Sequence, residues 1–254
     1  MNIIADMWRY AEGVYHEDLW VGVTPPKMPE LVGAIITPMI SELDSGYIAD
    51  FPDRIIIAFR GTKDLKAWIS DADVYPLRSD FDLNGGTLCD GFYTGWAVFK
   101  DTITNYIKTN RKDNVPIICT GHSRGGVLSV LCARHIAKNM GIPCSCIGFA
   151  GPMPGNGDAR DEIDMLPINL TRVTNGNDIV PTLPPYSLGF RQPGKILAKK
   201  GRWGFFTKIR DHYQSEYTTS IINYSKSKKD EEAVTILKEV LKRADHPKSW
   251  FWPF

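Results

Sequence analysis

Gly121-His122-Ser123-Arg124-Gly125 joins the apolar run 116–119 to a segment with helical spacing, 127–140. A G-x-S-x-G sequence between a strand and a helix is typical of a nucleophile elbow, a strained turn that lifts the serine hydroxyl clear of the sheet. The flanking glycines fit such a turn, because strand and helix almost touch there and leave no room for side chains. The motif predicts a nucleophile at Ser123, and the alternative is an ordinary glycine-rich turn.

Strand-like and helix-like segments alternate around this motif. The strand-like runs are 32–38, 46–51, 54–60, 145–150 and 168–173, and the helical patterns are 3–15, 97–109 and 231–243. The run 54–60 is apolar without alternation, which predicts a strand covered on both faces. The alternation predicts an α/β fold with a mainly parallel central sheet covered by helices on both faces. We find no internal repeat, so we expect a single domain, 1–254, with 221–254 as a C-terminal helical and aromatic extension.

Charge is balanced overall but unevenly distributed. The chain has 30 Lys or Arg against 29 Asp or Glu, whereas 191–254 holds 14 basic against 7 acidic residues. Within it, the stretch 191–210 carries seven basic side chains, interleaved aromatic residues and no acid. This composition suits peripheral contact with an anionic membrane surface, and it also suits a solvated hairpin with a few packed rings. Nucleic acid is not expected as a partner, because no nucleic-acid-binding motif accompanies the charge.

The beginning of the sequence and the cysteines bear on the compartment. Asp6 and Arg9 interrupt the apolar core that a signal peptide needs, and no run approaches the roughly 18 apolar residues of a transmembrane helix. The five cysteines are odd in number and widely dispersed, which favours reduced, buried thiols. We therefore expect a cytoplasmic location. No metal-ligand spacing is found, and no cofactor is expected.

A serine nucleophile needs an imidazole to take its proton and an acid to orient that imidazole. In α/β hydrolases the chain order is nucleophile, acid, histidine. This order leaves His212 and His246, because the other histidines precede Ser123 or lie within the helix that follows it. His212 is favoured, since it follows a strand-like run and an aromatic stretch, whereas His246 lies in a polar segment.

The acid is expected at Asp178, in a loop directly beyond the strand-like run 168–173. Loops at the carboxyl ends of strands usually carry the functional groups of open α/β sheets. Asp211 would point away from His212 in an extended segment. Three further acids lie in what reads as a solvated turn and helix start: Asp158, Asp161 and Asp164.

Six separated blocks resemble, in order and spacing, the fungal-type class 3 lipases. They are Phe59-Arg60-Gly61-Thr62, Trp68-Ile69-Ser70-Asp71, Gly91-Phe92, Gly121-His122-Ser123, Asn177-Asp178-Ile179-Val180-Pro181 with Leu183-Pro184-Pro185, and His212 with Glu216-Tyr217. The match runs from about residue 31 to residue 220. The resemblance implies an α/β-hydrolase fold, a triad of Ser123, Asp178 and His212, and hydrolysis of carboxylic esters, often those of acylglycerols.

The resemblance also implies an oxyanion hole. Its donors would be the backbone N–H and hydroxyl of Thr62 and the backbone N–H of Arg124. Such donors are each worth roughly 3 kcal/mol of barrier. The segment 64–72 corresponds to the lid helix of the family, and a packed surface helix is the alternative for it.

Two positions depart from the family pattern. Position 124, often leucine in these lipases, is arginine, and a cation there could select an anionic head group or pair with an acid such as Asp64. A salt bridge that holds the neighbouring loop is the other interpretation. Cys89 stands where fungal lipases often have histidine, and we do not interpret it as a catalytic thiol.

The leading interpretation is a serine-dependent hydrolase acting on a lipid or other small-molecule ester. A phospholipase or a small-ester esterase is the alternative among enzymes, because these differ in pocket shape rather than in triad. A lipase-like binding or regulatory protein without turnover is the alternative outside enzymes. The complete set of predicted triad and oxyanion residues argues against that last alternative.

Overall fold

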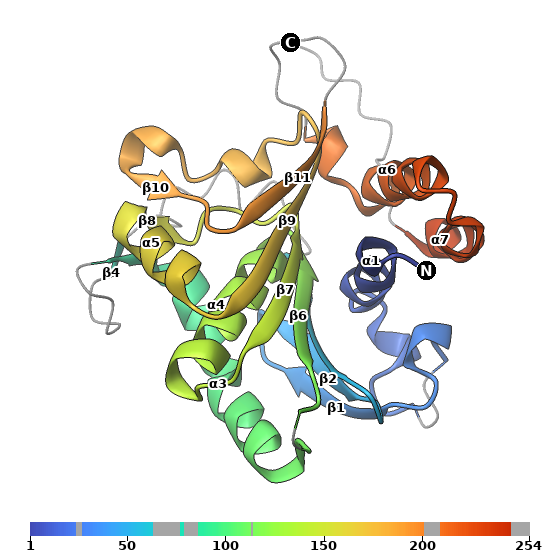
Figure 1. Ribbon diagram of the computed structural model, residues 1–254, viewed down its shortest axis with the longest axis horizontal. Coiled ribbons are helices and arrows are strands. Elements are labelled where there is room, and N and C mark those ends of the chain that lie inside the picture. The colour runs from blue at the N-terminus through green and yellow to red at the C-terminus, as the bar shows by residue number, and fades with distance from the viewer. Residues whose placement is uncertain (24–26, 63–76, 79–85, 113, 201–208, 245–254) are drawn as a thin grey trace.

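The computed structural model describes residues 1–23, 27–62, 77–78, 86–112, 114–200 and 209–244 (Figure 1). The predicted lid, 64–72, lies outside the described residues. So do 201–208 of the basic stretch and the aromatic end of the chain, 245–254.

The central sheet of the described part has seven strands in the order β1-β2-β3-β6-β7-β9-β11. Pairing is antiparallel from β1 to β3 and parallel from β3 to β11. The predicted mainly parallel sheet is therefore confirmed. The strands are β1 (Ile35–Ile40), β2 (Ser45–Asp50), β3 (Ile55–Phe59), β6 (Ile117–His122), β7 (Cys144–Phe149), β9 (Ile168–Gly176) and β11 (Lys195–Lys200).

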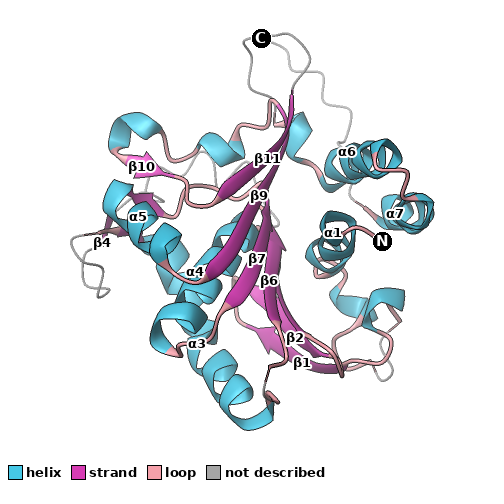
Figure 2. Ribbon diagram, viewed as in Figure 1, coloured by secondary structure: helices cyan, strands magenta, loops and turns pink. Residues whose placement is uncertain are grey.

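Helices cover both faces of this sheet, as predicted (Figures 1 and 2). One face carries α3 (Asp90–Asn110), α4 (Arg124–Asn139) and α5 (Gly157–Met165); the other carries α1 (Ile3–Gly13), α6 (Gln214–Ser227) and α7 (Glu231–Arg243). The bounds of α7 agree with the predicted helix 231–243. In contrast, α3 begins earlier than the predicted 97, and α6, which was not predicted, begins before residue 221. The division into one domain with an extension stays a prediction.

A second, smaller sheet was not predicted. Its order is β10-β8-β5-β4, and neighbouring strands pair antiparallel. The strands are β10 (Phe190–Arg191), β8 (Gly155–Asn156), β5 (Leu88–Cys89) and β4 (Leu77–Arg78). Two-residue strands are too short to produce a period-2 pattern in the sequence. Short 3₁₀ helices lie in the connections: η1 (Glu17–Leu19), η2 (Pro29–Leu31), η4 (Val180–Thr182), η5 (Tyr186–Leu188) and η6 (Arg210–His212).

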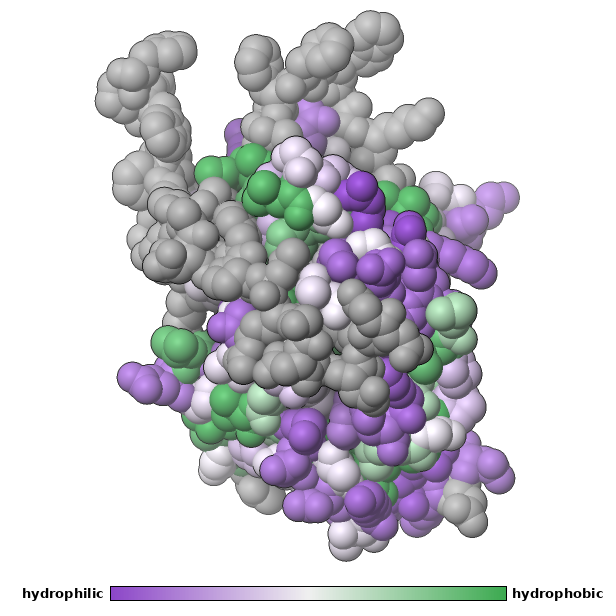
Figure 3. Space-filling view, turned by 90° about the vertical axis from the view of Figure 1, so that its left-hand side faces the viewer, coloured by the Kyte–Doolittle hydropathy of each residue, from purple (hydrophilic) through white to green (hydrophobic). Residues whose placement is uncertain are grey.

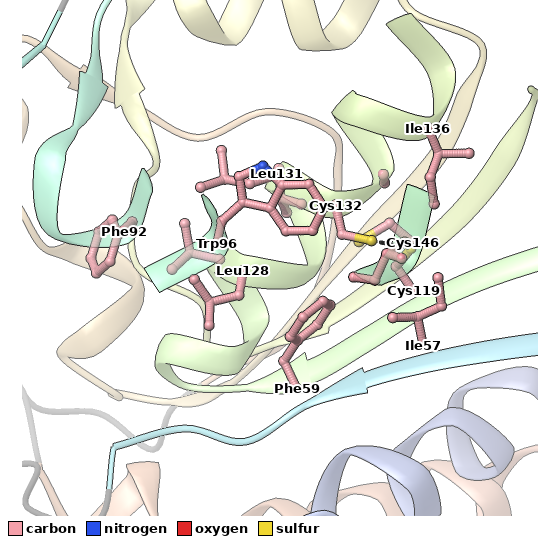
Figure 4. Packing of buried hydrophobic residues seen from close by; sticks show 14 of the residues in the cluster. Ile57, Phe59, Phe92, Trp96, Cys119, Leu128, Leu131, Cys132, Ile136 and Cys146 are labelled. Carbon is pink, nitrogen blue, oxygen red and sulfur yellow. Dashed lines mark hydrogen bonds between the residues drawn. The ribbon is translucent and has the colours of Figure 1, made fainter. Parts of the chain in front are cut away.

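The central strand β3 explains why its sequence lacks alternation. Ile55, Ile57 and Phe59 pack into the core beneath α3 and α4, whereas the intervening residues Ile56 and Ala58 pack into the core beneath α1, α6 and α7. All five side chains are fully buried. Figure 4 shows the first of these cores, with Phe59 and Ile57 beneath side chains of α3 and α4. Both faces of the strand are therefore apolar because both are covered.

The turn between β6 and α4 has the strained geometry that the motif predicts. Ser123 adopts φ 60° and ψ −128°, a backbone conformation that non-glycine residues rarely adopt. A Cβ atom on Gly121 would collide with the carbonyl of Gly125, and one on Gly125 would collide with the carbonyl of Phe59. The two glycines thus let β3, β6 and α4 meet at the turn.

Gly125→Ala is expected to lower the free energy of unfolding by about 1 to 3 kcal/mol, because the obstructing atom belongs to the backbone of β3 and cannot rotate away. Urea denaturation measures the loss. Gly91→Ala is the matched control, since a Cβ on Gly91 meets nothing within 4 Å. Equal stability of the two variants would contradict the steric explanation.

Candidate active site

Two of the predicted site residues, Asp178 and His212, form a buried pair. Asp178 lies in the loop beyond β9, and His212 is the last residue of η6. The imidazole Nδ1 lies 3.0 Å from Oδ1 and 2.9 Å from Oδ2 of the carboxylate. Both residues are buried. The acid and the histidine chosen from the sequence are therefore in hydrogen-bond contact.

Further hydrogen bonds hold the carboxylate of Asp178. The Tyr217 hydroxyl donates to Oδ2 at 2.8 Å, and the backbone N–H of Val180 donates to Oδ1 at 3.0 Å. The same hydroxyl accepts from the backbone N–H of Asn175 at 3.1 Å. Burial raises the pKa of Tyr217 well above its ordinary value, so the phenol keeps the proton that it donates. Tyr217 belongs to one of the six sequence blocks, but the sequence alone did not indicate this contact.

Asp211 makes its contacts with residues other than His212, although its segment is a 3₁₀ helix, η6, and not the extended segment expected from the sequence. Its carboxylate accepts from the backbone N–H of Asn177 at 2.8 Å, and its carbonyl accepts from the side chain of Asn175 at 3.0 Å. Asp211 therefore ties the histidine segment to the loop that carries Asp178.

The serine turn lies beside the histidine segment. The ring of His122, the residue before Ser123, has its centroid 4.7 Å from that of His212. Ser123 itself is buried. The Nε2 atom of His212 is buried and has no hydrogen-bond partner among the described residues, so this nitrogen is available for a proton-transfer partner. Ser123 and the Asp178 loop both stand at the carboxyl ends of parallel strands, on the same edge of the sheet.

The segment just beyond β3 packs against the serine turn. A Cβ atom on Gly61 would lie 2.6 Å from the carbonyl oxygen of His122 and 2.9 Å from Cβ of Ser123. Glycine therefore permits this close approach. Thr62, the next residue, is half-buried. Thr62, the predicted oxyanion-hole residue, thus directly follows Gly61, which packs against the serine turn.

The side chain of Arg124 makes a salt bridge. Its Nε and Nη2 atoms lie 2.7 Å and 3.0 Å from the two carboxylate oxygens of Asp44, and Nη2 also donates to the carbonyl of Gly91 at 2.9 Å. Asp44 is buried, so the cation is neutralised within the protein. This favours the interpretation of a salt bridge that holds a neighbouring loop, with the acid at the β1–β2 turn. Asp64, the partner considered from the sequence, lies outside the described residues.

All five cysteines are buried and free, as the sequence predicts. Burial raises the pKa of the Cys89 thiol to about 11, so this thiol is protonated at neutral pH and is a poor nucleophile. Across the described ranges, no group of three or more His, Cys, Asp or Glu residues has an arrangement that could hold a metal ion. Nor is any helix in them both long and apolar enough to span a bilayer.

The family model for "Lipase (class 3)" matches residues 56–188. The chain belongs to the class 3 lipase family. The match includes all but the first residue of β3, the serine turn and Asp178, and it ends before His212. Membership confirms the resemblance that the six sequence blocks indicated.

Curated relatives include lipases and phospholipases. The secreted mono- and diacylglycerol lipase A of Penicillium cyclopium is 30% identical over 205 residues, which cover 73% of this chain and 66% of that protein. Phospholipase A1-II 3 of Oryza sativa subsp. indica is 29% identical and covers 56% of this chain and 41% of that protein. This chain thus spans less than two thirds of the length of these relatives.

Solved lipase structures share the fold. The lipase from Rhizopus microsporus var. chinensis superposes with a TM-score of 0.69 at 21% identity, covering 79% of this chain and 75% of that one. Lipase II from Rhizopus niveus gives a TM-score of 0.70 at 22% identity, covering 78% and 80%. The predicted α/β-hydrolase fold is confirmed.

The predicted cytoplasmic location is wrong. Two relatives, from Penicillium cyclopium and Fusarium solani, are named as secreted lipases. The prediction relied on the first residues of the sequence and on the expected reduced thiols. The thiols are buried in strands and a helix of the core, and such packing does not depend on the compartment.

Proposed function

We propose that this class 3 lipase hydrolyses carboxylic esters of lipids through Ser123, His212 and Asp178. The observation that carries the proposal is the buried His212–Asp178 pair beside a strained serine turn in a chain of this family. Within the described residues, Nε2 of His212 has no hydrogen-bond partner. The named activities of the relatives favour an acylglycerol as substrate. The secreted relatives favour an extracellular place of action.

The reaction follows from the chemistry of these groups. Ser123 Oγ attacks the acyl carbonyl while His212 Nε2 takes its proton, and the imidazolium then donates that proton to the leaving alcohol. Asp178 accepts the hydrogen bond from Nδ1–H, which leaves Nε2 unprotonated and able to act as the base. Water, activated by the same imidazole, cleaves the acyl-enzyme and releases the acid.

A phospholipase activity is the second candidate, and the match to a rice phospholipase A1 favours it. Both activities use the same triad, so a substrate panel separates them: diacylglycerol, phosphatidylcholine and a soluble short-chain p-nitrophenyl ester. A small-ester esterase would prefer the last of these. A binding protein without turnover would hydrolyse none.

A fluorophosphonate probe tests the proposed nucleophile, since it reacts with an activated serine and leaves ordinary hydroxyls unmodified. Mass spectrometry of the digested protein should find the label on the peptide that contains Ser123. A label on another serine, or none on a folded protein that hydrolyses esters, would contradict the proposal.

Thr62→Val is expected to lower kcat for the short-chain ester by about 10² to 10³, because it removes one proposed donor to the developing oxyanion. The change is nearly isosteric, so the fold should be retained. Thr104→Val is the control, since it removes a hydroxyl on α3 that contacts His135. A Thr62 variant with the turnover of the control would exclude the hydroxyl as an oxyanion donor.

We also propose peripheral contact with anionic membranes through the basic stretch 191–210. In its described part, Lys195 is exposed and the adjacent Ile196 is 58% exposed, both on the edge strand β11. The structure does not describe the side chains of Lys199, Lys200 and Arg202. On the face shown in Figure 3, hydrophobic residues lie in separate groups among polar ones, some of them beside the grey segments. A basic, partly apolar edge suits an anionic lipid surface.

Lys195→Glu is expected to weaken binding to anionic vesicles by about 1 kcal/mol or more, with a smaller loss at high salt. Sedimentation with phosphatidylserine-containing and pure phosphatidylcholine vesicles measures it. Lys108→Glu, an exposed change on α3, is the control. Hydrolysis of a soluble ester must stay unchanged in both variants, and equal binding of wild type to both vesicle types would contradict membrane contact.

A further inference from the structure

The side chain of His122, the residue before the proposed nucleophile, lies in an aromatic cluster beside His212. Its ring is buried and makes an edge contact with Trp8 at 5.5 Å and with Tyr217 at 5.3 Å between ring centroids. Trp8 stacks on Tyr217 at 5.6 Å, and its indole N–H donates to Thr218 at 2.9 Å. The cluster joins α1 and α6 next to the ring of His212. The proposed reaction gives this histidine no role.

Both ring nitrogens of His122 have hydrogen-bond partners. Nε2 lies 2.9 Å from the backbone carbonyl oxygen of His212, and Nδ1 lies 3.0 Å from the hydroxyl of Tyr15. A carbonyl oxygen can only accept, so Nε2 must carry the proton. In a neutral ring Nδ1 is then the acceptor, and the Tyr15 hydroxyl donates to it. The two contacts together define one tautomer.

The environment keeps this ring neutral. Burial lowers the pKa of His122 well below its ordinary value, and the neighbouring His212 lowers it further. Neutrality matters because the His212 ring, 4.7 Å away between centroids, becomes an imidazolium during the proposed reaction. A second cation at that distance would oppose the proton transfer.

The hydrogen bond to His212 connects the nucleophile to the base by a short path. His122 is the residue next to Ser123, and the bond ends on the main chain of His212 itself. The backbone N–H of Ser123 is in turn held by the carbonyl of Phe149 at 2.9 Å. His212 lies in η6, and the bond joins this short helix to the end of β6.

We propose that His122 is a positioning residue that holds the backbone of His212 at the serine turn, with its tautomer set by Tyr15. Tyr15 follows α1, and both lie outside the range matched by the family model, 56–188. The segment after α1 therefore contributes to the alignment of the base. This inference rests on the proposed function.

The test compares His122→Phe with His122→Gln. Phenylalanine keeps an aromatic ring in the cluster but removes both hydrogen bonds, whereas the glutamine amide can still donate to the His212 carbonyl. We expect His122→Phe to lower kcat for a soluble short-chain ester, and the rate of fluorophosphonate labelling, by about 10 to 100-fold with little change in KM. His122→Gln should recover part of this loss. His135→Gln, which changes a half-buried histidine on α4 that contacts Thr104, should behave as wild type.

Nuclear magnetic resonance reads the tautomer of His122 in the wild-type protein, and this measurement needs no variant. In ¹⁵N-histidine-labelled wild type at neutral pH, His122 should be the neutral Nε2–H tautomer. The low-field proton between His212 and Asp178 should be present in wild type and shifted or broadened in His122→Phe. A protonated His122, or the Nδ1–H tautomer, would overturn the inference whether or not the variants fold.

Ser123→Ala, measured in parallel, separates the two proposals. If it keeps wild-type hydrolysis, the proposed function fails, and the role of His122 fails with it. If it abolishes hydrolysis and labelling while His122→Phe keeps the wild-type kcat and labelling rate, the proposed function stands and the role of His122 is overturned.

Discussion

Ser123→Ala is expected to lower kcat for ester hydrolysis by about 10⁴ to 10⁶, the largest effect of any single change in this chain. Alanine removes the atom that forms the acyl-enzyme, and no buried cysteine can replace it, because burial keeps the thiols protonated. The residual rate would come from binding and from the oxyanion donors alone. Initial rates on a short-chain p-nitrophenyl ester, with purified protein at high concentration, measure the loss.

The control is Ser129→Ala. Ser129 lies on α4, close in sequence to the turn, and its buried hydroxyl donates to the backbone carbonyl of Gly126 at 2.7 Å. Its removal changes a helix contact without touching the expected reaction. If both alanine variants keep comparable turnover, the nucleophile is not Ser123. Ser123→Ala should also leave the backbone strain at position 123 nearly unchanged, because Gly121 and Gly125 determine the geometry of the turn.

The parts of the fold that follow local rules could be predicted from the sequence. β3 could be predicted from its apolar run, which does not alternate because both faces of the strand are covered. α7 has an Asp230 N-cap and an apolar stripe, which together mark its ends. The serine turn was recognisable because steric contact across it admits only glycine at positions 121 and 125.

Contacts between distant segments could not be predicted in this way. Arg124 and Asp44 are 80 residues apart, and nothing local to either residue indicates the other. Tyr217 reaches Asp178 because α6 folds back onto β9, an arrangement that periodicity does not encode. The two-residue strands of the small sheet have no recognisable sequence pattern, and they pair because the fold brings their segments together. The pairing of His212 with Asp178 was predictable in part, since chain order and loop position limited the choices.

Asp178→Asn is expected to lower kcat by about 10⁴ while leaving the fold intact. An asparagine amide in the place of the carboxylate can donate to Nδ1 of His212, and this would stabilise the tautomer with the proton on Nε2. That nitrogen would then offer a proton to Ser123 instead of a lone pair. The imidazolium would also lose the negative charge that lies 2.9 Å from Nδ1. The pH-rate profile on a soluble ester, together with kcat, measures both consequences.

Asp161→Asn is the control for this prediction. Asp161 is one of the three acids that the sequence placed in a solvated turn and helix start rather than in the site, and it makes an exposed contact with Arg160. Exposed pairs contribute about 0 to 1 kcal/mol to stability, so this variant should keep wild-type turnover. In Asp178→Asn the single amide oxygen can accept from the Tyr217 hydroxyl, which should preserve the packing of α6 on β9, while the hydrogen bond from the backbone N–H of Val180 is lost. A loss of turnover without a loss of stability would thus report the charge and the tautomer, whereas wild-type kcat in Asp178→Asn would remove Asp178 from the proposed triad.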